Sequence, residues 1–214
     1  MYNIVDMKLI RLCVFGDKDV GKTSLFASFK KSQKLSDSSR MSVVGMCDQI
    51  SVRVNIDNTW YKMYYYEINS SKNNKLLVER IAPMFYEQVD LFLICYLMVD
   101  PASYSHIPTY YNNILTHSPH ANIVFVGTKR DLVDQPQIVG ELRERGECPL
   151  TFGVCGIVCG CVCRGVCAES KVVSSESGMG VSGLFEDVIL KCHSKMKENQ
   201  ICHFVVKSSN FEFS

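Results

Sequence analysis

The stretch LCVFGDKDVGKTSLF (Leu12–Phe26) decides how this chain folds. A short, largely apolar run, Lys8–Phe15, predicts a buried strand, and Lys22–Lys31 predicts a helix. The loop between them has a glycine near each end and runs into a lysine and a threonine. A strand, such a loop and a helix in succession predict a site that holds the phosphates of a nucleotide.

The loop has the P-loop pattern Gly16-x-x-x-x-Gly21-Lys22-Thr23. Its glycines let backbone N–H groups surround the phosphates, and the helix adds its dipole at the same place. We expect Lys22 to neutralise charge on the outer phosphates and the hydroxyl of Thr23 to ligate Mg²⁺. A tight strand-to-helix turn that binds nothing is the alternative. The loop residues expected to contact the nucleotide are Gly16, Asp17, Lys18, Asp19, Val20, Gly21, Lys22, Thr23 and Ser24.

The composition limits the class of protein. The chain has 214 residues, 47% of them hydrophobic, and a net charge of +1, which predicts one globular domain with an insertion or a tail. This charge gives no reason to expect nucleic acid or an anionic membrane as the main partner. We expect no secretory signal, and the uncharged run Cys148–Cys163 is shorter than a bilayer requires. Eleven cysteines in such a chain predict reduced thiols in the cytosol.

Strand and helix patterns alternate along the rest of the chain. Leu91–Val99 and Asn122–Thr128 are short and apolar, which is typical of parallel strands covered on both faces. Gln49–Asp57 and Trp60–Glu67 flank Asp57–Asn58, a hairpin signal. This alternation predicts an α/β fold, a three-layer sandwich with a mostly parallel sheet. We also expect helices at Lys75–Val89 (disturbed by Pro83), Ala102–His117 and Val181–Met196, and a loop at the serine-rich Ser32–Ser42.

A second motif follows one of these strands. The segment VFVGTKRDL places Thr128, Lys129 and Asp131 directly after apolar residues. It resembles the guanine-recognition motif of small GTPases of the Ras superfamily, in the Thr-Lys-x-Asp form typical of the Rho/Rac branch. The carboxylate of Asp131 accepts two hydrogen bonds from guanine that adenine does not offer, and the stem of Lys129 lies over the base. An exposed polar turn is the alternative when the tetrapeptide is taken alone.

Three further segments are similar to the same family. VVSSESGMGVSGLFEDVI resembles the turn that presents backbone N–H groups to guanine and the helix that follows it. ERIAPMFYEQVDLFLICYLMVD resembles a Rho-type segment, and Pro136–Cys148 lies where Rho proteins carry an extra helix. Beyond the phosphate loop, the residues expected at the nucleotide are Thr128, Lys129, Asp131, Leu132, Ser174, Ser175 and Glu176.

The resemblance covers residues 8–195. It implies the P-loop NTPase (small G-protein) fold with a mostly parallel six-stranded sheet. The implied domain is 1–197, with a Rho-type insertion and cysteine-rich segment at about 136–170 and a tail at 198–214. It also implies GTP or GDP bound with Mg²⁺, and effector and regulator proteins as partners.

The departures from the family fall where the γ-phosphate is sensed. Glu67 stands in place of the aspartate that holds the Mg²⁺ shell, so its role is expected to be indirect. Ser70 replaces a glycine, and Ser71 replaces the glutamine that orients the attacking water. Alignment by spacing puts Gly45 at the position of the switch threonine, with Ser42 as an outside candidate.

Lys18 lies at a loop position where the family has glycine. A side chain there crowds the water-orienting glutamine and an arginine finger, although a lysine pointing into solvent is the alternative. We therefore expect GTP hydrolysis to be slow or lost. No catalytic residue is assigned, since Ser71 and Lys18 only occupy the relevant positions.

Six of the eleven cysteines lie between Cys148 and Cys167. Cys-x-Cys-x-Cys offers thiolates to a metal, but the residues between the cysteines are apolar and no histidine is near. We therefore favour packing of buried cysteines over a metal site.

The carboxyl-terminal segment lacks a polybasic run and a prenylation motif, so prenylation is not expected, and nothing distinguishes Cys192 or Cys202 as acylation sites. These features predict a cytoplasmic protein whose association with membranes is at most conditional. Two hypotheses for the function follow: a Rho-like GTP-binding signalling protein, and a degenerate pseudo-GTPase that serves as a protein-interaction scaffold. A P-loop kinase is disfavoured because it has no use for Thr128, Lys129 and Asp131.

Overall fold

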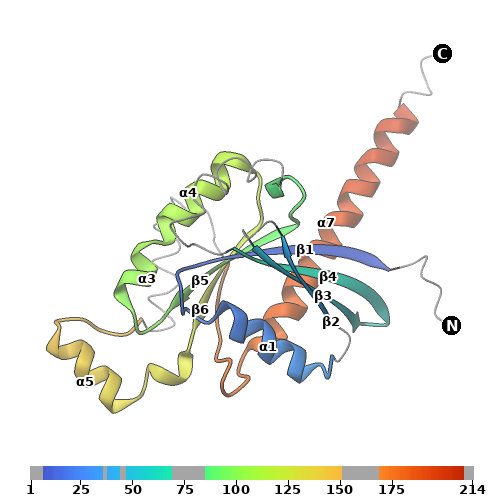
Figure 1. Ribbon diagram of the computed structural model, residues 1–214. Helices are drawn as coiled ribbons and strands as arrows, with labels where there is room; N and C mark the ends of the chain where they lie inside the picture. The colour runs from blue at the N-terminus through green and yellow to red at the C-terminus, as the bar shows by residue number, and fades with distance from the viewer. Residues whose placement is uncertain (1–6, 36–37, 44–46, 69–84, 151–168, 210–214) are drawn as a thin grey trace.

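One mixed sheet organises the described part of the chain (Figure 1). The computed structural model describes residues 7–35, 38–43, 47–68, 85–150 and 169–209, with the backbone alone at 38–43, 47 and 197–209. The elements are β1 (Lys8–Phe15), α1 (Lys22–Ser32), β2 (Ser38–Val43), β3 (Cys47–Ile56), β4 (Thr59–Ile68), β5 (Leu91–Leu97), α3 (Pro101–Ser105), α4 (Ile107–His117), β6 (Ile123–Thr128), η3 (Arg130–Leu132), α5 (Pro136–Glu144), β7 (Glu169–Val172) and α7 (Val181–Ser209).

The strand order is β2-β3-β4-β1-β5-β6-β7. The two pairs β2–β3 and β3–β4 are antiparallel, and the other pairs are parallel. The predicted α/β fold with a mostly parallel sheet is therefore confirmed. The described sheet has seven strands where the resemblance implies six, because β2 pairs with β3 and extends the antiparallel edge. Because β1 lies between β4 and β5, the order along the sheet changes direction beside it, and a ligand-binding crevice forms at the carboxyl end of such a strand.

The loop prediction for Ser32–Ser42 is wrong at its carboxyl end, where β2 begins at Ser38. An edge strand needs only backbone hydrogen bonds to one neighbour, and β3 supplies them from Cys47 to Val52, so no apolar periodicity is required. The hairpin prediction is confirmed: Asp57 and Asn58 join β3 to β4 with φ angles of +48° and +60°.

Two layers of helices cover the sheet. Figure 1 shows α3 and α4 on one face and α1 and α7 on the other. Helix α7 runs past residue 197, where the sequence places the start of a tail, and ends at Ser209. None of the helices in the described ranges has the length and apolar character that crossing a membrane requires.

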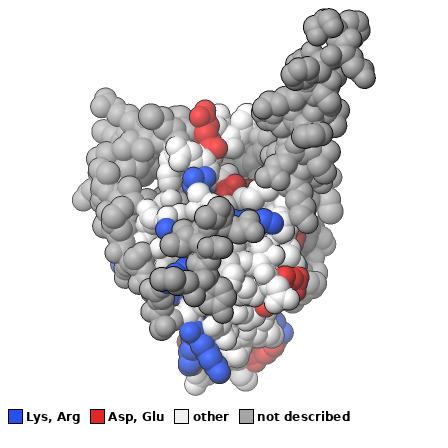
Figure 2. All heavy atoms as spheres, turned by 90° about the vertical axis from the view of Figure 1, so that its right-hand side faces the viewer, with Lys and Arg blue, Asp and Glu red and all other residues white. Residues whose placement is uncertain are grey.

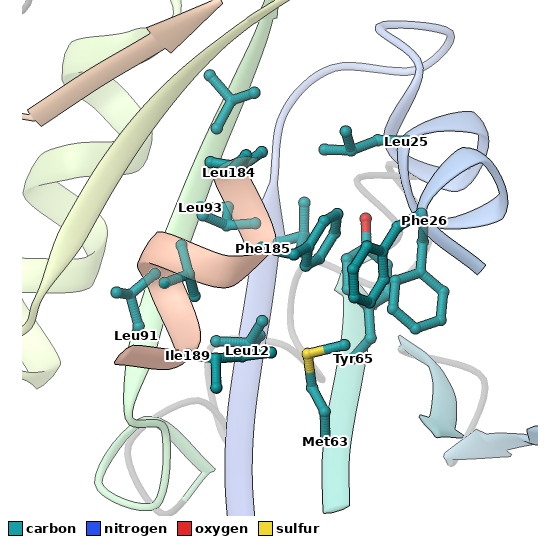
Figure 3. Close-up of a cluster of buried hydrophobic side chains, with 14 of the residues drawn as sticks. Leu12, Leu25, Phe26, Met63, Tyr65, Leu91, Leu93, Leu184, Phe185 and Ile189 are labelled. Carbon is teal, nitrogen blue, oxygen red and sulfur yellow. The ribbon is translucent and has the colours of Figure 1, made fainter. Parts of the chain in front are cut away.

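The core under α1 and α7 is rich in stacked aromatic rings (Figure 3). Phe26 of α1 stacks on Tyr65 of β4 with ring centroids 4.2 Å apart, and Phe29 stacks on Phe185 of α7 at the same distance. The rings of Phe26 and Phe185 also meet edge to face at 5.8 Å. These contacts join α1, which begins at the phosphate loop, to the sheet and to the last helix.

The surface carries charges of both signs. On the face shown in Figure 2, Lys and Arg are interspersed with Asp and Glu, and basic side chains gather most at its lower end. This distribution agrees with the net charge of +1.

We predict that Phe185→Ala destabilises the fold by about 3–5 kcal/mol, because a fully buried ring and its stacking contact are lost. Leu190→Ala on the same helix is the control: its side chain is 39% exposed, and the expected loss is below about 1 kcal/mol. Unfolding in urea, followed by circular dichroism, measures both. Equal losses in the two variants would contradict this account of the core.

Candidate functional site: a phosphate loop beside a base-recognition turn

The phosphate loop connects β1 to α1 in a conformation that its glycines permit. Gly16 has φ +142°, and a Cβ atom there would lie 2.3 Å from the carbonyl oxygen of Cys95 in β5. Gly21 has φ +94° at the start of α1, and Asp19 has φ +64°. The loop therefore lies directly against the end of β5, and only glycine fits at its first position.

Lys22 is almost buried, with 7% of its surface exposed. Its Nζ donates to the carbonyl oxygens of Gly16 at 2.9 Å and of Asp17 at 2.6 Å. These carbonyl oxygens are neutral, so they accept hydrogen bonds from the ammonium group but do not balance its positive charge. A phosphate anion would balance that charge. The hydroxyl of Tyr65 donates to the carbonyl oxygen of Lys22 at 2.8 Å and fixes the first turn of α1. Burial raises the pKa of the Cys95 thiol to about 12, although the positive charge of Lys22 opposes the shift.

Thr23 and Glu67 are brought together. The hydroxyl of Thr23 lies 2.8 Å from each carboxylate oxygen of Glu67 and donates its proton to them. Glu67, near the end of β4, is nearly buried at 9% exposure. The proton points toward Glu67, so the hydroxyl oxygen keeps lone pairs for a cation. An oxygen-only set of this kind fits Mg²⁺.

The segment Thr128–Asp131, which we call the base-recognition turn, contacts the phosphate loop through Thr128. Its hydroxyl lies 2.6 Å from the carbonyl oxygen of Val20 and 2.9 Å from that of Tyr96, and its single proton is shared between these two acceptors. Lys129 follows in the left-handed region, with φ +53°. Its Cε would lie 4.0 Å from a Cβ atom placed on Gly21, so the lysine stem passes over the end of the loop.

Asp131 is held by the turn that precedes α7. The hydroxyl of Ser174 donates to Oδ1 of Asp131 at 2.5 Å, and Ser174 Oγ accepts from the backbone N–H of Ser177 at 3.2 Å. The N–H of Arg130 donates to the carbonyl oxygen of Val173 at 3.1 Å. A carboxylate accepts about four hydrogen bonds, so the bond from Ser174 orients Asp131 and leaves acceptor capacity for a base.

The remaining predicted nucleotide residues lie on the same elements. Ser24 is exposed in the first turn of α1, and Leu132 ends η3. Ser175 and Glu176 lie in the turn that contains Ser174. The structure therefore gathers the predicted phosphate and base residues at the carboxyl ends of four strands: the segments that follow β1, β6 and β7, and Glu67 within β4 itself.

Of the residues predicted near the γ-phosphate, some lie within the described part of the chain and some do not. Gly45, Ser70 and Ser71 lie outside the described residues, while Lys18 is exposed in the loop. The backbone of Ser42 lies in β2, opposite Asp48 of β3.

The cysteine-rich segment lies almost wholly outside the described residues. Of its six cysteines only Cys148 is described, and it is exposed. Within the described ranges, no three His, Cys, Asp or Glu residues are grouped so that they can hold a metal ion.

Sequence reasoning missed the partners of the Asp17 side chain. Its carboxylate accepts hydrogen bonds from His106, between α3 and α4, and from Tyr110 of α4. Tyr65 was also missed as a support of the loop, although its place on the buried face of β4, two residues from Met63, gives a weak signal. No sequence pattern links Asp17 to residues about ninety positions away.

A comparison with family models matches the part of the chain that carries most of this site. The model described as Ras family matches residues 11–147, which is more than half of the 214 residues. The matched part contains the phosphate loop, Glu67 and Asp131 and ends before Ser174.

We predict that Gly16→Ala lowers the free energy of unfolding by about 3 kcal/mol, because the new methyl group strains the backbone and meets the Cys95 carbonyl. Gly183→Ala is the matched control: no atom lies within 4 Å of its added Cβ, and alanine should stabilise α7 by up to about 1 kcal/mol. Thermal unfolding of both variants gives the comparison. A Gly16 variant as stable as the wild type would show that the loop does not lie against β5.

Proposed function

The chain belongs to the Ras family, and on that premise we propose that it is a Rho-like small GTPase that binds GTP and GDP, signals through effector proteins, and hydrolyses GTP slowly or not at all. Family membership implies guanine-nucleotide binding with Mg²⁺, and regulators and effectors as partners. One observation carries the proposal: Thr128 joins the loop that holds Lys22 to the turn that holds Asp131.

Guanine is selected at Asp131 by the direction of its hydrogen bonds. The ring N–H and exocyclic amine of guanine are adjacent donors, and an ionised carboxylate only accepts. Adenine presents an acceptor nitrogen at the corresponding ring position, which repels the carboxylate. Ser174 holds Oδ1 of Asp131, so the carboxylate is oriented before the base arrives.

Thr23 and Glu67 are the residues that would hold Mg²⁺. When bound, Mg²⁺ neutralises charge on the outer phosphates. Thr23 offers its hydroxyl oxygen, and Glu67 accepts the proton of that hydroxyl and adds a negative charge.

Two features support the Rho-like branch. The base-recognition turn has the threonine form, and Thr128 uses its hydroxyl as the link between loop and turn. Helix α5, at Pro136–Glu144, occupies the segment where the extra helix of Rho proteins is expected. We further propose a cytoplasmic location, with membrane association that is at most conditional.

The proposal of slow hydrolysis rests on four positions. Ser71 has too short a side chain to orient water as glutamine does, and Ser70 and Gly45 replace two residues that meet the γ-phosphate. Lys18 is exposed in the loop, where the family has glycine. Nucleotide binding requires no side chain at any of these four positions, so binding and hydrolysis are separable.

We predict that the purified protein binds fluorescent GDP and GTP and that Asp131→Ala weakens both by about 100-fold or more, because two hydrogen bonds to a charged acceptor are lost. Asp134→Ala is the matched control, since it removes a carboxylate three residues away that is 75% exposed and paired with Arg130. Fluorescence titration with and without Mg²⁺ measures the affinities. If the protein bound neither nucleotide, this proposal would be refuted and the alternative, a protein-interaction scaffold, would be favoured.

We predict that bound GTP persists for many hours, and that combining Lys18→Gly with Ser71→Gln increases the hydrolysis rate by at least about 10-fold, because a water-orienting amide is restored and the crowding side chain is removed. Single-turnover hydrolysis of prebound GTP, followed by chromatography of the released nucleotide, measures the rate. Rapid hydrolysis by the wild type would refute the proposal of slow hydrolysis without affecting the proposal of guanine binding.

A further inference from the structure

The carboxylate of Asp17 points from the phosphate loop to α4. Nδ1 of His106 lies 2.7 Å from Oδ2, and the hydroxyl of Tyr110 donates to Oδ1 at 2.6 Å. An ionised carboxylate cannot donate, so Nδ1 of His106 carries the hydrogen. Both oxygens of one loop side chain are thus held by residues from a different element.

Tyr110 contacts the chain on both sides of Gly16. Its ring packs against Phe15, the last residue of β1, with centroids 6.0 Å apart, while its hydroxyl bonds Asp17. His106 lies between α3 and α4, and Tyr110 lies one turn further along in α4. The beginning of the loop is therefore fixed to α4 and to the residue before it by a ring contact and two hydrogen bonds.

Asp17 also contributes to the inner side of the loop. Its carbonyl oxygen accepts from Nζ of Lys22 at 2.6 Å, so the backbone of Asp17 positions the lysine that faces the phosphates. Movement of Asp17 therefore moves an acceptor of Lys22 and the neighbouring N–H groups of the loop.

A carboxylate in a phosphate loop raises an electrostatic problem. A negative charge close to a nucleoside diphosphate repels it, unless the charge is turned away and compensated. His106 and Tyr110 do both, because they hold the carboxylate against α4 and supply two hydrogen-bond donors to it.

We propose that His106 and Tyr110 are positioning residues for the phosphate loop: they hold the carboxylate of Asp17 away from the phosphates and thereby slow the release of guanine nucleotide. This inference rests on the proposed function, because it concerns retention of the nucleotide that the site binds. The side chain of His106 is 55% exposed and that of Asp17 is 25% exposed, so the contact is partly solvated and the expected effects are moderate.

The test measures dissociation of fluorescent GDP, chased with excess unlabelled GDP in Mg²⁺. The double variant His106→Gln, Tyr110→Phe should release GDP at least about 5-fold faster than the wild type. Adding Asp17→Asn to that background should bring the rate back to within about 2-fold of the wild type, since the freed negative charge is removed. A role in packing alone would not give this rescue.

Tyr111→Phe is the matched control on the same helix. Its ring stacks on Phe125 of β6, and it should release GDP at the wild-type rate. Tyr110→Phe alone, which keeps the ring against Phe15, serves as a second variant if the double variant unfolds, and it should also accelerate release.

Two outcomes would overturn the inference: release at the wild-type rate from the His106 and Tyr110 variants, or fast release that Asp17→Asn does not reverse. In either case GDP binding by the wild type keeps the proposed function in place. A wild-type protein that binds no GDP would refute both the proposed function and this inference.

Discussion

The hydroxyl of Thr128 connects the two halves of the site. It lies within hydrogen-bond distance of the carbonyl oxygens of Val20 in the phosphate loop and Tyr96 at the end of β5, and only 1% of Thr128 is exposed. One buried residue at the end of β6 thereby fixes the distance between a phosphate-binding loop and a base-binding turn. Selective binding of a nucleotide depends on that distance, because the phosphates and the base belong to one ligand of limited length.

The strongest sequence signals came from segments whose local chemistry permits few alternatives. Lys8–Phe15 is largely apolar and β1 has these bounds, and the hairpin predicted at Asp57–Asn58 agrees with the positive φ angles of these two residues. The short edge strands β2 and β7 have no such signal, because pairing with a neighbour stabilises them more than their own residues do. Local patterns therefore predict the centre of the sheet better than its edges.

The same contrast holds within the site. Glycine spacing and the order of Lys22, Thr23 and Asp131 predict which residues the structure brings together at the candidate site, since their chemistry depends on short motifs. The contacts that orient them are long-range: Tyr65 with Lys22, and His106 with Asp17. Such contacts depend on how the helices pack on the sheet. Neither residue periodicity nor a short motif in a single sequence predicts that packing.

We propose that this geometry selects a guanine nucleotide over an adenine nucleotide. Native mass spectrometry of the wild-type protein, mixed with equal amounts of GDP and ADP in the presence of Mg²⁺, tests it most directly. We expect one GDP bound per chain and no bound ADP, because Asp131 and Lys22 act on one ligand. Equal binding of both nucleotides, or binding of neither, would contradict it.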